Sequence, residues 1–181
     1  MGGLKALFWL CVFVVSDAPR DTFTVSSPSV AEALVIGGPQ KKADWATTPS
    51  VRICSDSGVS FSRASQAIRY WEMLGYDFDD VRSDVQPVCR EPYFGEIVIT
   101  LPDGKFENHH IAATRLYTQT STGKIVKAKI QIFPKSARKE RVLEHEIGHA
   151  LGWSHYSQRF HMMHPAWLYG GFNSKGLRKH N

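Results

Sequence analysis

The sequence has no apolar run long enough to cross a lipid bilayer. The run Ala6 to Val15 contains ten residues, whereas a membrane-spanning helix needs about 20. Lys5 precedes this run and the small residues of Ser16-Asp17-Ala18 follow it, which is typical of a secretory signal. We therefore expect residues 1–18 to be a signal peptide, the mature chain to be secreted, and no stable membrane anchor to be present. A buried amino-terminal strand is the alternative.

The chain also lacks internal repeats, heptad patterns and motifs typical of nucleic-acid binding. Basic residues are in modest excess, with 22 Lys and Arg against 17 Asp and Glu. They gather before residue 142 and in the tail, where they could favour acidic substrates but are expected to form solvated faces. We expect a monomer that does not bind nucleic acid.

Cysteine is scarce, with three residues in the chain. Cys11 lies inside the expected signal peptide, which leaves Cys54 and Cys89. Two thiols in an exported chain predict one disulfide, worth on the order of 3 to 4 kcal/mol at this loop length. Two free buried cysteines are the alternative.

Hydrophobic periodicity predicts an α+β domain. A helix is expected over Phe61–Leu74, with Gly75 as its stop. Strands are expected over Ser50–Asp56, Glu96–Leu101, Ile111–Thr118 and Lys124–Phe133. Residues 19–48 have little pattern and are expected to be a linker or short pro-region, with a brief ordered piece near Ala31–Val35. Residues 49–181 would form the folded domain.

The most informative string is HEIGHALGWSH, which begins at His145. On a helix, His145 and His149 lie one turn apart on the same face and can bind one cation. Gly152 can turn the chain in a left-handed conformation, so that His155 returns as a third ligand. Three protein ligands leave a fourth position for water, as in catalytic zinc sites. Glu146 can take a proton from the attacking water and pass it to the leaving amine.

The helix that carries this string is expected to begin at Ser136 as the N-cap, with Glu140 near its positive end. Its buried stripe would consist of Leu143, Ile147, Ala150 and Leu151. The short HExxH string also occurs by chance in helices that bind nothing, but the added glycine and third histidine make the pattern far more specific. His161 and His164 are expected to be surface histidines.

The string resembles the signature of the metzincin clan of zinc endopeptidases, in which HExxHxxGxxH is followed by a methionine turn. Met163 lies eight residues after His155, and Pro165 follows two residues later, which is similar to the matrixin group. The resemblance implies a metzincin-like zincin domain with a twisted mixed sheet of about five strands and two main helices. The zinc cleft would lie beneath an edge strand. Met163 would form an apolar floor under the histidines, and Pro165 and Trp167 would line a substrate pocket.

The resemblance further implies a secreted zinc endopeptidase with one catalytic zinc ion. An extended protein or peptide substrate would pair with an edge strand between Ala113 and Thr118. Structural calcium or a second zinc ion is not indicated, because the chain lacks the acidic and glycine-rich loops that would bind them. His109 and His110 are adjacent, so their side chains would point apart on an extended backbone. The alternatives are a zinc-stabilised binding module and a hydrolase acting on a non-peptide bond.

Overall fold

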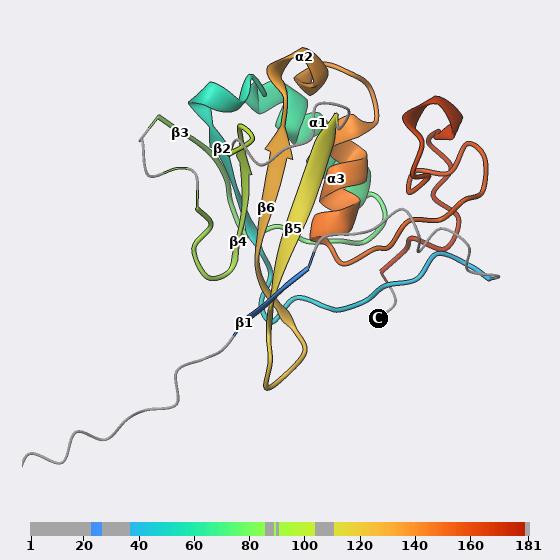
Figure 1. Ribbon diagram of the computed structural model, residues 1–181, viewed down its shortest axis with the longest axis horizontal. Coiled ribbons are helices and arrows are strands. Elements are labelled where there is room, and N and C mark those ends of the chain that lie inside the picture. Colours follow the sequence, from blue (N-terminus) through green and yellow to red (C-terminus); the bar gives the residue numbers. More distant parts are fainter. Residues whose placement is uncertain (1–22, 27–36, 86–88, 90, 104–110, 180–181) are drawn as a thin grey trace, which may run out of the picture.

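The computed structural model describes residues 23–26, 37–85, 89, 91–103 and 111–179. These residues form an α+β structure in which helices cover one face of a six-stranded mixed sheet (Figure 1). The strands are β1 (Phe23–Ser26), β2 (Ser50–Cys54), β3 (Val81–Asp84), β4 (Glu96–Thr100), β5 (Ala112–Gln119) and β6 (Ile125–Ile132). The helices are α1 (Phe61–Glu72), α2 (Pro134–Ala137) and α3 (Val142–Ala150), with 3-10 turns at Ser55–Ser57 and Trp167–Tyr169.

The strand order in the sheet is β1-β5-β6-β4-β2-β3. β2, β3, β4 and β6 run parallel, whereas β5 is antiparallel to β6 and β1 is antiparallel to β5. The α+β prediction and the four expected strands are confirmed to within two residues at each end. The sheet has six strands rather than the expected five or so. Periodicity did not predict β1 and β3, because each has only four residues, with exposed or half-buried side chains and no apolar alternation.

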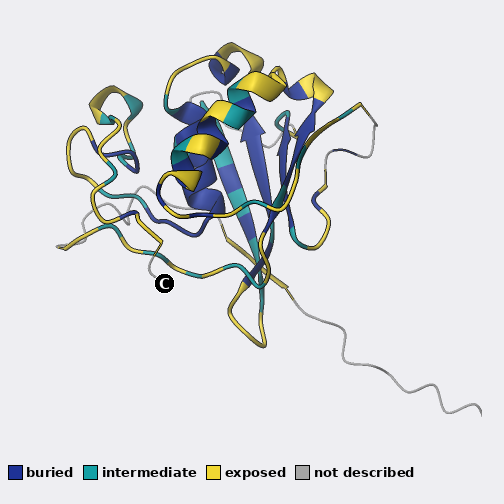
Figure 2. Cartoon of the chain, turned by 180° about the vertical axis from the view of Figure 1, so that it is seen from behind, coloured by how far each residue is buried: buried dark blue, intermediate teal, exposed yellow. Residues whose placement is uncertain are grey.

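Helix α1 forms as its periodicity predicts. Ser60 caps it by accepting a hydrogen bond from the Arg63 N–H at 3.2 Å, and Gly75 turns the chain after it with φ +92°. Its apolar stripe, made of Ala64, Ala67, Ile68 and Trp71, is buried against the sheet and α3. Figure 2 shows the same division across the domain, with buried residues in the strands and on the inner sides of the helices.

The predicted start of the helix that carries His145 and His149 is wrong. Pro134 occupies the first turn of the separate short helix α2, and Arg141 then takes the left-handed conformation with φ +67°, which interrupts the helix before Val142. Ser136 is buried in α2 and caps nothing. Glu140 is exposed in the connection between the two helices. Proline favours the first turn of a helix, which explains why the chain forms the separate helix α2 at Pro134, eight residues before α3 begins at Val142.

Two polar contacts join α1 to α3. The Trp71 indole N–H donates to the Glu144 carbonyl at 2.8 Å, and the Arg63 guanidinium donates to both Glu144 carboxylate oxygens at 2.8 and 2.6 Å. Glu144 also lies in the first turn of α3, where a carboxylate interacts favourably with the helix dipole. The two helices are therefore fixed to each other at the turn that precedes the first histidine.

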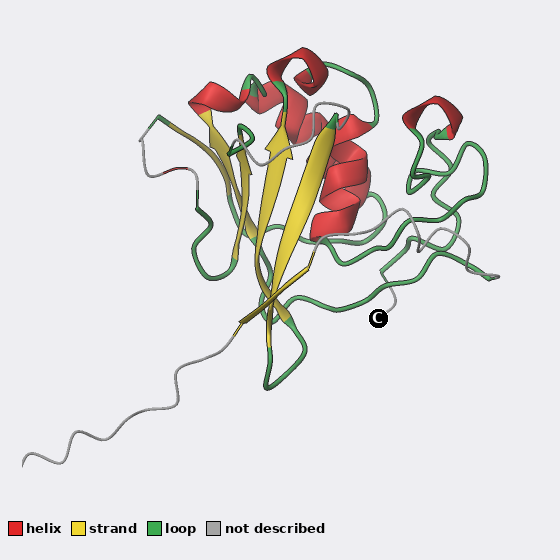
Figure 3. Ribbon diagram, in the orientation of Figure 1, coloured by secondary structure: helices red, strands yellow, loops and turns green. Residues whose placement is uncertain are grey.

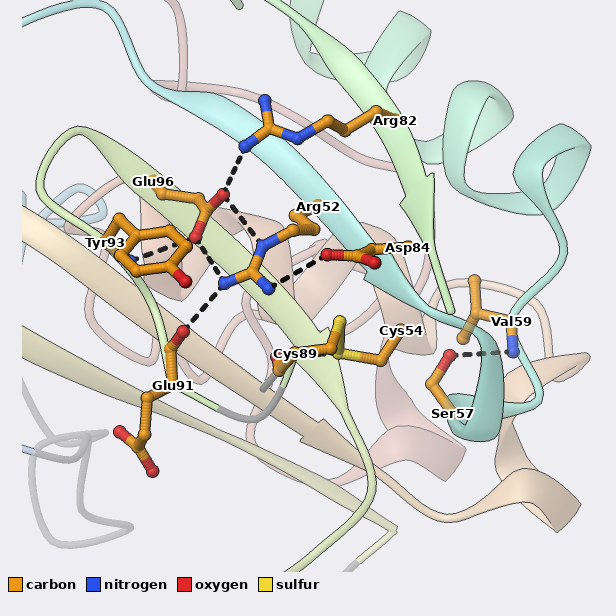
Figure 4. The surroundings of a disulfide bond; sticks show 10 residues. All are labelled: Arg52, Cys54, Ser57, Val59, Arg82, Asp84, Cys89, Glu91, Tyr93 and Glu96. Atoms are coloured by element: carbon orange, nitrogen blue, oxygen red, sulfur yellow. Dashed lines mark hydrogen bonds and ion pairs between the residues drawn. A yellow bond between two sulfur atoms is a disulfide. The ribbon is translucent and has the colours of Figure 1, made fainter. Parts of the chain in front are cut away.

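The face of the sheet opposite the helices buries charged side chains beside a disulfide (Figure 4). Cys54 and Cys89 are bonded, as predicted, which ties the end of β2 to the segment before β4. Next to them, the buried Arg52 guanidinium donates to both carboxylate oxygens of Glu96 at 2.9 and 2.8 Å. Arg82 donates to the same carboxylate at 2.8 Å. Such paired burial satisfies charges that would otherwise be costly in the interior.

Several predictions concern residues outside the described ranges. They are the signal peptide, the ordered piece near Ala31–Val35, and the adjacent pair His109 and His110. Within the described ranges, no helix is long and apolar enough to span a bilayer.

We expect Arg52→Met to lower the free energy of unfolding by about 3 kcal/mol or more, because it leaves the buried Glu96 carboxylate without its bidentate partner. Lys179→Met removes the exposed ion pair with Asp77 and should cost about 1 kcal/mol or less. Urea unfolding followed by tryptophan fluorescence measures both. Equal effects of the two substitutions would contradict a structural role for the buried pair.

Candidate metal centre

The structure brings the three predicted histidines together. His145 and His149 project from α3, and His155 follows the turn that ends this helix. One ligand atom from each ring lies within 4.8 Å of the other two, and the Nε2 atoms of His149 and His155 are 3.1 Å apart. In the described part of the chain, no other group of three His, Cys, Asp or Glu side chains is arranged in this way. The triad can therefore hold a metal ion.

Backbone carbonyls orient two of the rings. His145 Nδ1 lies 2.8 Å from the Met162 carbonyl oxygen, and His149 Nδ1 lies 2.7 Å from that of Trp153. A carbonyl oxygen only accepts hydrogen bonds, so Nδ1 carries the proton in both rings. The Nε2 atoms then present lone pairs, which is the arrangement that a metal-binding histidine requires.

Burial also keeps these imidazoles neutral. Burial, together with the charge of the nearby His155, lowers the pKa of His145 to about 4. Burial together with the charges of His145 and His155 holds the pKa of His149 well below its ordinary value of 6.5. Because a protonated imidazole cannot bind a metal, both rings are ready to act as ligands at neutral pH.

The turn to His155 depends on glycine and on a segment from the amino-terminal side. Gly152 has φ +97°, as predicted, and a Cβ there would lie 2.2 Å from the Ala43 carbonyl oxygen. The Lys42 N–H donates to the Gly152 carbonyl at 2.8 Å, and the Trp45 indole donates to the Ala150 carbonyl at 2.8 Å. Residues 42–45 lie within the expected linker, yet they hold the ligand turn against the domain.

Glu146 follows the first histidine of the triad on α3 and is buried. Burial raises its pKa and a hydrogen bond from Thr114 lowers it, and the combined effect is a pKa of about 7. The Thr114 hydroxyl lies 2.7 Å from Glu146 Oε2. Thr114 was not predicted as a site residue, although its position in β5 supplies a signal: it lies two residues before the buried Leu116 and therefore on the same face of the strand.

Met163, Pro165 and Trp167 lie in the irregular chain after α3, which contains one short 3-10 turn among its described residues (Figure 3). Met163 is fully buried, and a Cβ added to Gly148 would lie 2.5 Å from its sulfur, so this side chain packs against α3 between the two helical ligands. Pro165 is half-buried. Trp167 is also half-buried, and its indole donates to the Glu140 carbonyl at 3.0 Å.

His161 corrects another expectation, because it is buried rather than exposed. Its Nδ1 accepts a hydrogen bond from the Met163 N–H at 3.1 Å, and its Nε2 lies 3.1 Å from the Lys175 carbonyl oxygen. Burial lowers its pKa. This ring joins the methionine segment to the tail of the chain, a contact between distant residues that sequence spacing does not reveal.

Comparison with known proteins found no relative of this chain. No protein-family model, curated protein or solved structure matches the chain.

The pKa values predict opposing pH dependences for the metal-free protein. His145 titrates near 4 when folded and near 6.5 when unfolded, so its contribution to the free energy of unfolding rises with pH across that interval. Glu146 titrates near 7 when folded and near 4.5 when unfolded, so its contribution falls as pH rises between those values. Glu146→Gln removes this contribution to the free energy of unfolding, which falls as the pH rises. Between pH 4.5 and 6.5 we expect a slope steeper by about one proton, or ~1.4 kcal/mol per pH unit.

Urea unfolding across this pH range measures the slope. Glu140→Gln, which removes an exposed glutamate six residues earlier, is the matched control and should leave the slope unchanged. If Glu146→Gln gave the same slope as the control, the inference that the buried Glu146 is protonated in this pH range would be wrong.

Proposed function

We propose that the protein is a secreted zinc endopeptidase with a metzincin-like catalytic domain. The observation that carries this proposal is the convergence of three histidines, together with the buried carboxylate of Glu146, which follows the first of them on α3. The order of strand, helix, strands and histidine-bearing helix supports it, since this is the order of the matrixin domains that the sequence resembles. A protein or peptide is the proposed substrate.

The donor set suits zinc. Zinc binds imidazole nitrogens at about 2.0–2.1 Å in tetrahedral geometry, which places ligand atoms about 3.3 Å apart. His149 and His155 already lie 3.1 Å apart through their Nε2 atoms. The neutral imidazoles and the hydrogen bonds from Nδ1 to carbonyl oxygens are typical of zinc-binding histidines. One catalytic zinc ion held by His145, His149 and His155 is therefore the proposed cofactor.

When bound, zinc lowers the pKa of a water molecule and polarises the carbonyl group of the scissile bond. Glu146 performs the proton transfer. Its pKa of about 7 lets the carboxylate accept a proton from the attacking water near neutral pH and then donate it to the leaving amine. The Thr114 hydroxyl holds Oε2, so Oε1 is the oxygen that exchanges the proton.

The substrate would bind in extended form along β5. This strand lies beside α3, and Thr114 near its start contacts the proposed general base. A peptide that pairs with the side of β5 facing away from β6, which β1 covers from Leu116 to Gln119, gains main-chain hydrogen bonds and places one of its peptide bonds near Glu146. Pro165 and Trp167 are the proposed wall of the pocket on the far side of that bond.

The first test is cleavage of casein by the zinc-loaded chain, with new termini identified by mass spectrometry. Glu146→Ala should reduce cleavage by about a thousand-fold or more, because it removes the general base, and should still bind one zinc ion. His149→Ala should lose both zinc and cleavage. A Glu146→Ala protein as active as the wild type would refute the mechanism. Absence of cleavage by a zinc-loaded wild type would favour a zinc-stabilised binding module.

Thr114→Val should shift the acid limb of the pH profile of kcat/KM upward, because the lost hydrogen bond no longer lowers the pKa of Glu146. Thr114→Ser keeps the hydroxyl and is the matched control, whose acid limb should stay in place. A profile of Thr114→Val that coincides with that of Thr114→Ser would mean that the hydrogen bond does not set the ionisation of the base.

A further inference from the structure

The side of β5 that faces away from β6 is already paired with part of this chain. Phe23–Ser26, which form β1, lie antiparallel to β5 with Phe23 opposite Gln119 and Ser26 opposite Leu116 (Figure 1). This is the strand that would pair with an extended substrate. A bound peptide and β1 therefore require the same row of backbone groups on β5.

The position and direction of β1 relate it to the proposed catalytic group. Ser26 pairs with Leu116, two residues from Thr114, whose hydroxyl contacts Glu146. The chain runs from Phe23 to Ser26 towards that contact, as an antiparallel peptide with its cleaved bond near Glu146 would run. β1 thus covers positions that lie on the amino-terminal side of the cleaved bond.

The contacts that hold β1 are few and lie at the surface. All four of its side chains are exposed. The Thr118 hydroxyl lies 3.3 Å from that of Thr24, and the Lys127 ammonium lies 5.2 Å from the centre of the Phe23 ring. No β1 side chain enters the core, so main-chain pairing is the principal attachment. A strand attached in this way can be displaced without unfolding the domain.

We propose that β1 is an internal competitor for the peptide-binding edge of β5. This proposal rests on the proposed endopeptidase function. It assigns Leu116–Gln119 as the surface that binds the amino-terminal side of an extended substrate. A substrate that reaches these residues must displace β1, whereas a substrate that ends before them need not. The chain thereby reduces its activity on long extended segments until β1 leaves the edge.

Proline substitutions in β1 test the pairing with a built-in control. Alternate residues of an antiparallel strand donate their N–H to the neighbouring strand, while the others point away. Of Thr24→Pro and Val25→Pro, one therefore removes a donor to β5 and the other removes an N–H that faces solvent, a position where proline is tolerated. Both side chains are exposed, so neither substitution disturbs the core.

The measured quantity is kcat/KM for two fluorogenic peptides built around a bond that the enzyme cleaves in casein. One peptide has six residues before the cleaved bond and the other has two. We expect one proline variant to raise kcat/KM for the long peptide by about five-fold, because it frees a site that β1 otherwise occupies. The other variant should match the wild type, and the short peptide should respond to neither.

Equal activity of the wild type and both variants on the long peptide would overturn the competition and leave the endopeptidase function intact. An equal gain in both variants would also overturn it, since the gain would not depend on the hydrogen bonds to β5. Absence of cleavage by every zinc-loaded protein would instead count against the proposed function.

A binding measurement decides the competition independently of turnover. A fluorescein-labelled peptide with the sequence of residues 21–27 is titrated with the zinc-loaded chain carrying Glu146→Ala, alone and with each proline substitution, and followed by fluorescence anisotropy. The variant that frees β5 should bind this peptide about five-fold more tightly than the parent. Equal affinity for all three proteins would overturn the proposal.

Discussion

The fold depends on burying α3, a helix whose buried side chains include three ionisable groups. Glu144, Glu146 and His149 are all buried, and each meets a polar partner from a different part of the chain. Arg63 of α1 pairs with Glu144, Thr114 of β5 bonds Glu146, and the Trp153 carbonyl accepts from His149. Because an unpaired ionisable group in the interior is costly, α1, β5 and the turn after α3 must all be in place for this helix to pack.

The irregular chain after α3 belongs to the same arrangement. The Met162 carbonyl orients the His145 ring, while the Met162 N–H donates to the Asn173 carbonyl at 2.8 Å. His161 connects the same stretch to the Lys175 carbonyl. The tail thus supports the segment that orients His145 without forming a helix or strand. The orientation of this first histidine therefore depends on residues about thirty positions later.

Local pattern predicts the parts of this molecule that have a local cause. Short apolar segments locate β4 and β6, helical spacing locates α1, and the glycine at position 152 has the left-handed conformation that its spacing to His155 requires. The pairing of Cys54 with Cys89 also agrees with prediction. The strands, the helix and the glycine turn depend on the residues within each segment. The disulfide was predictable because only two cysteines lie outside the expected signal peptide.

The features that sequence reasoning missed depend on distant contacts. β1 and β3 exist because neighbouring strands offer edges to pair with, and their own side chains show no apolar alternation. The break before α3 arises because Pro134 begins a turn and Arg141 then adopts a left-handed conformation. Thr114 becomes a site residue only because β5 places it opposite Glu146. The contacts of residues 42–45 join segments about a hundred positions apart, which no window along the sequence can show.

This separation along the chain also affects how the domain folds. The Trp45 indole bonds a carbonyl 105 residues later, and forming so non-local a contact carries a loop-closure cost that slows folding. During synthesis this aromatic residue leaves the ribosome long before its partner. The contact that holds the turn before His155 can therefore form only after most of the domain has been synthesised.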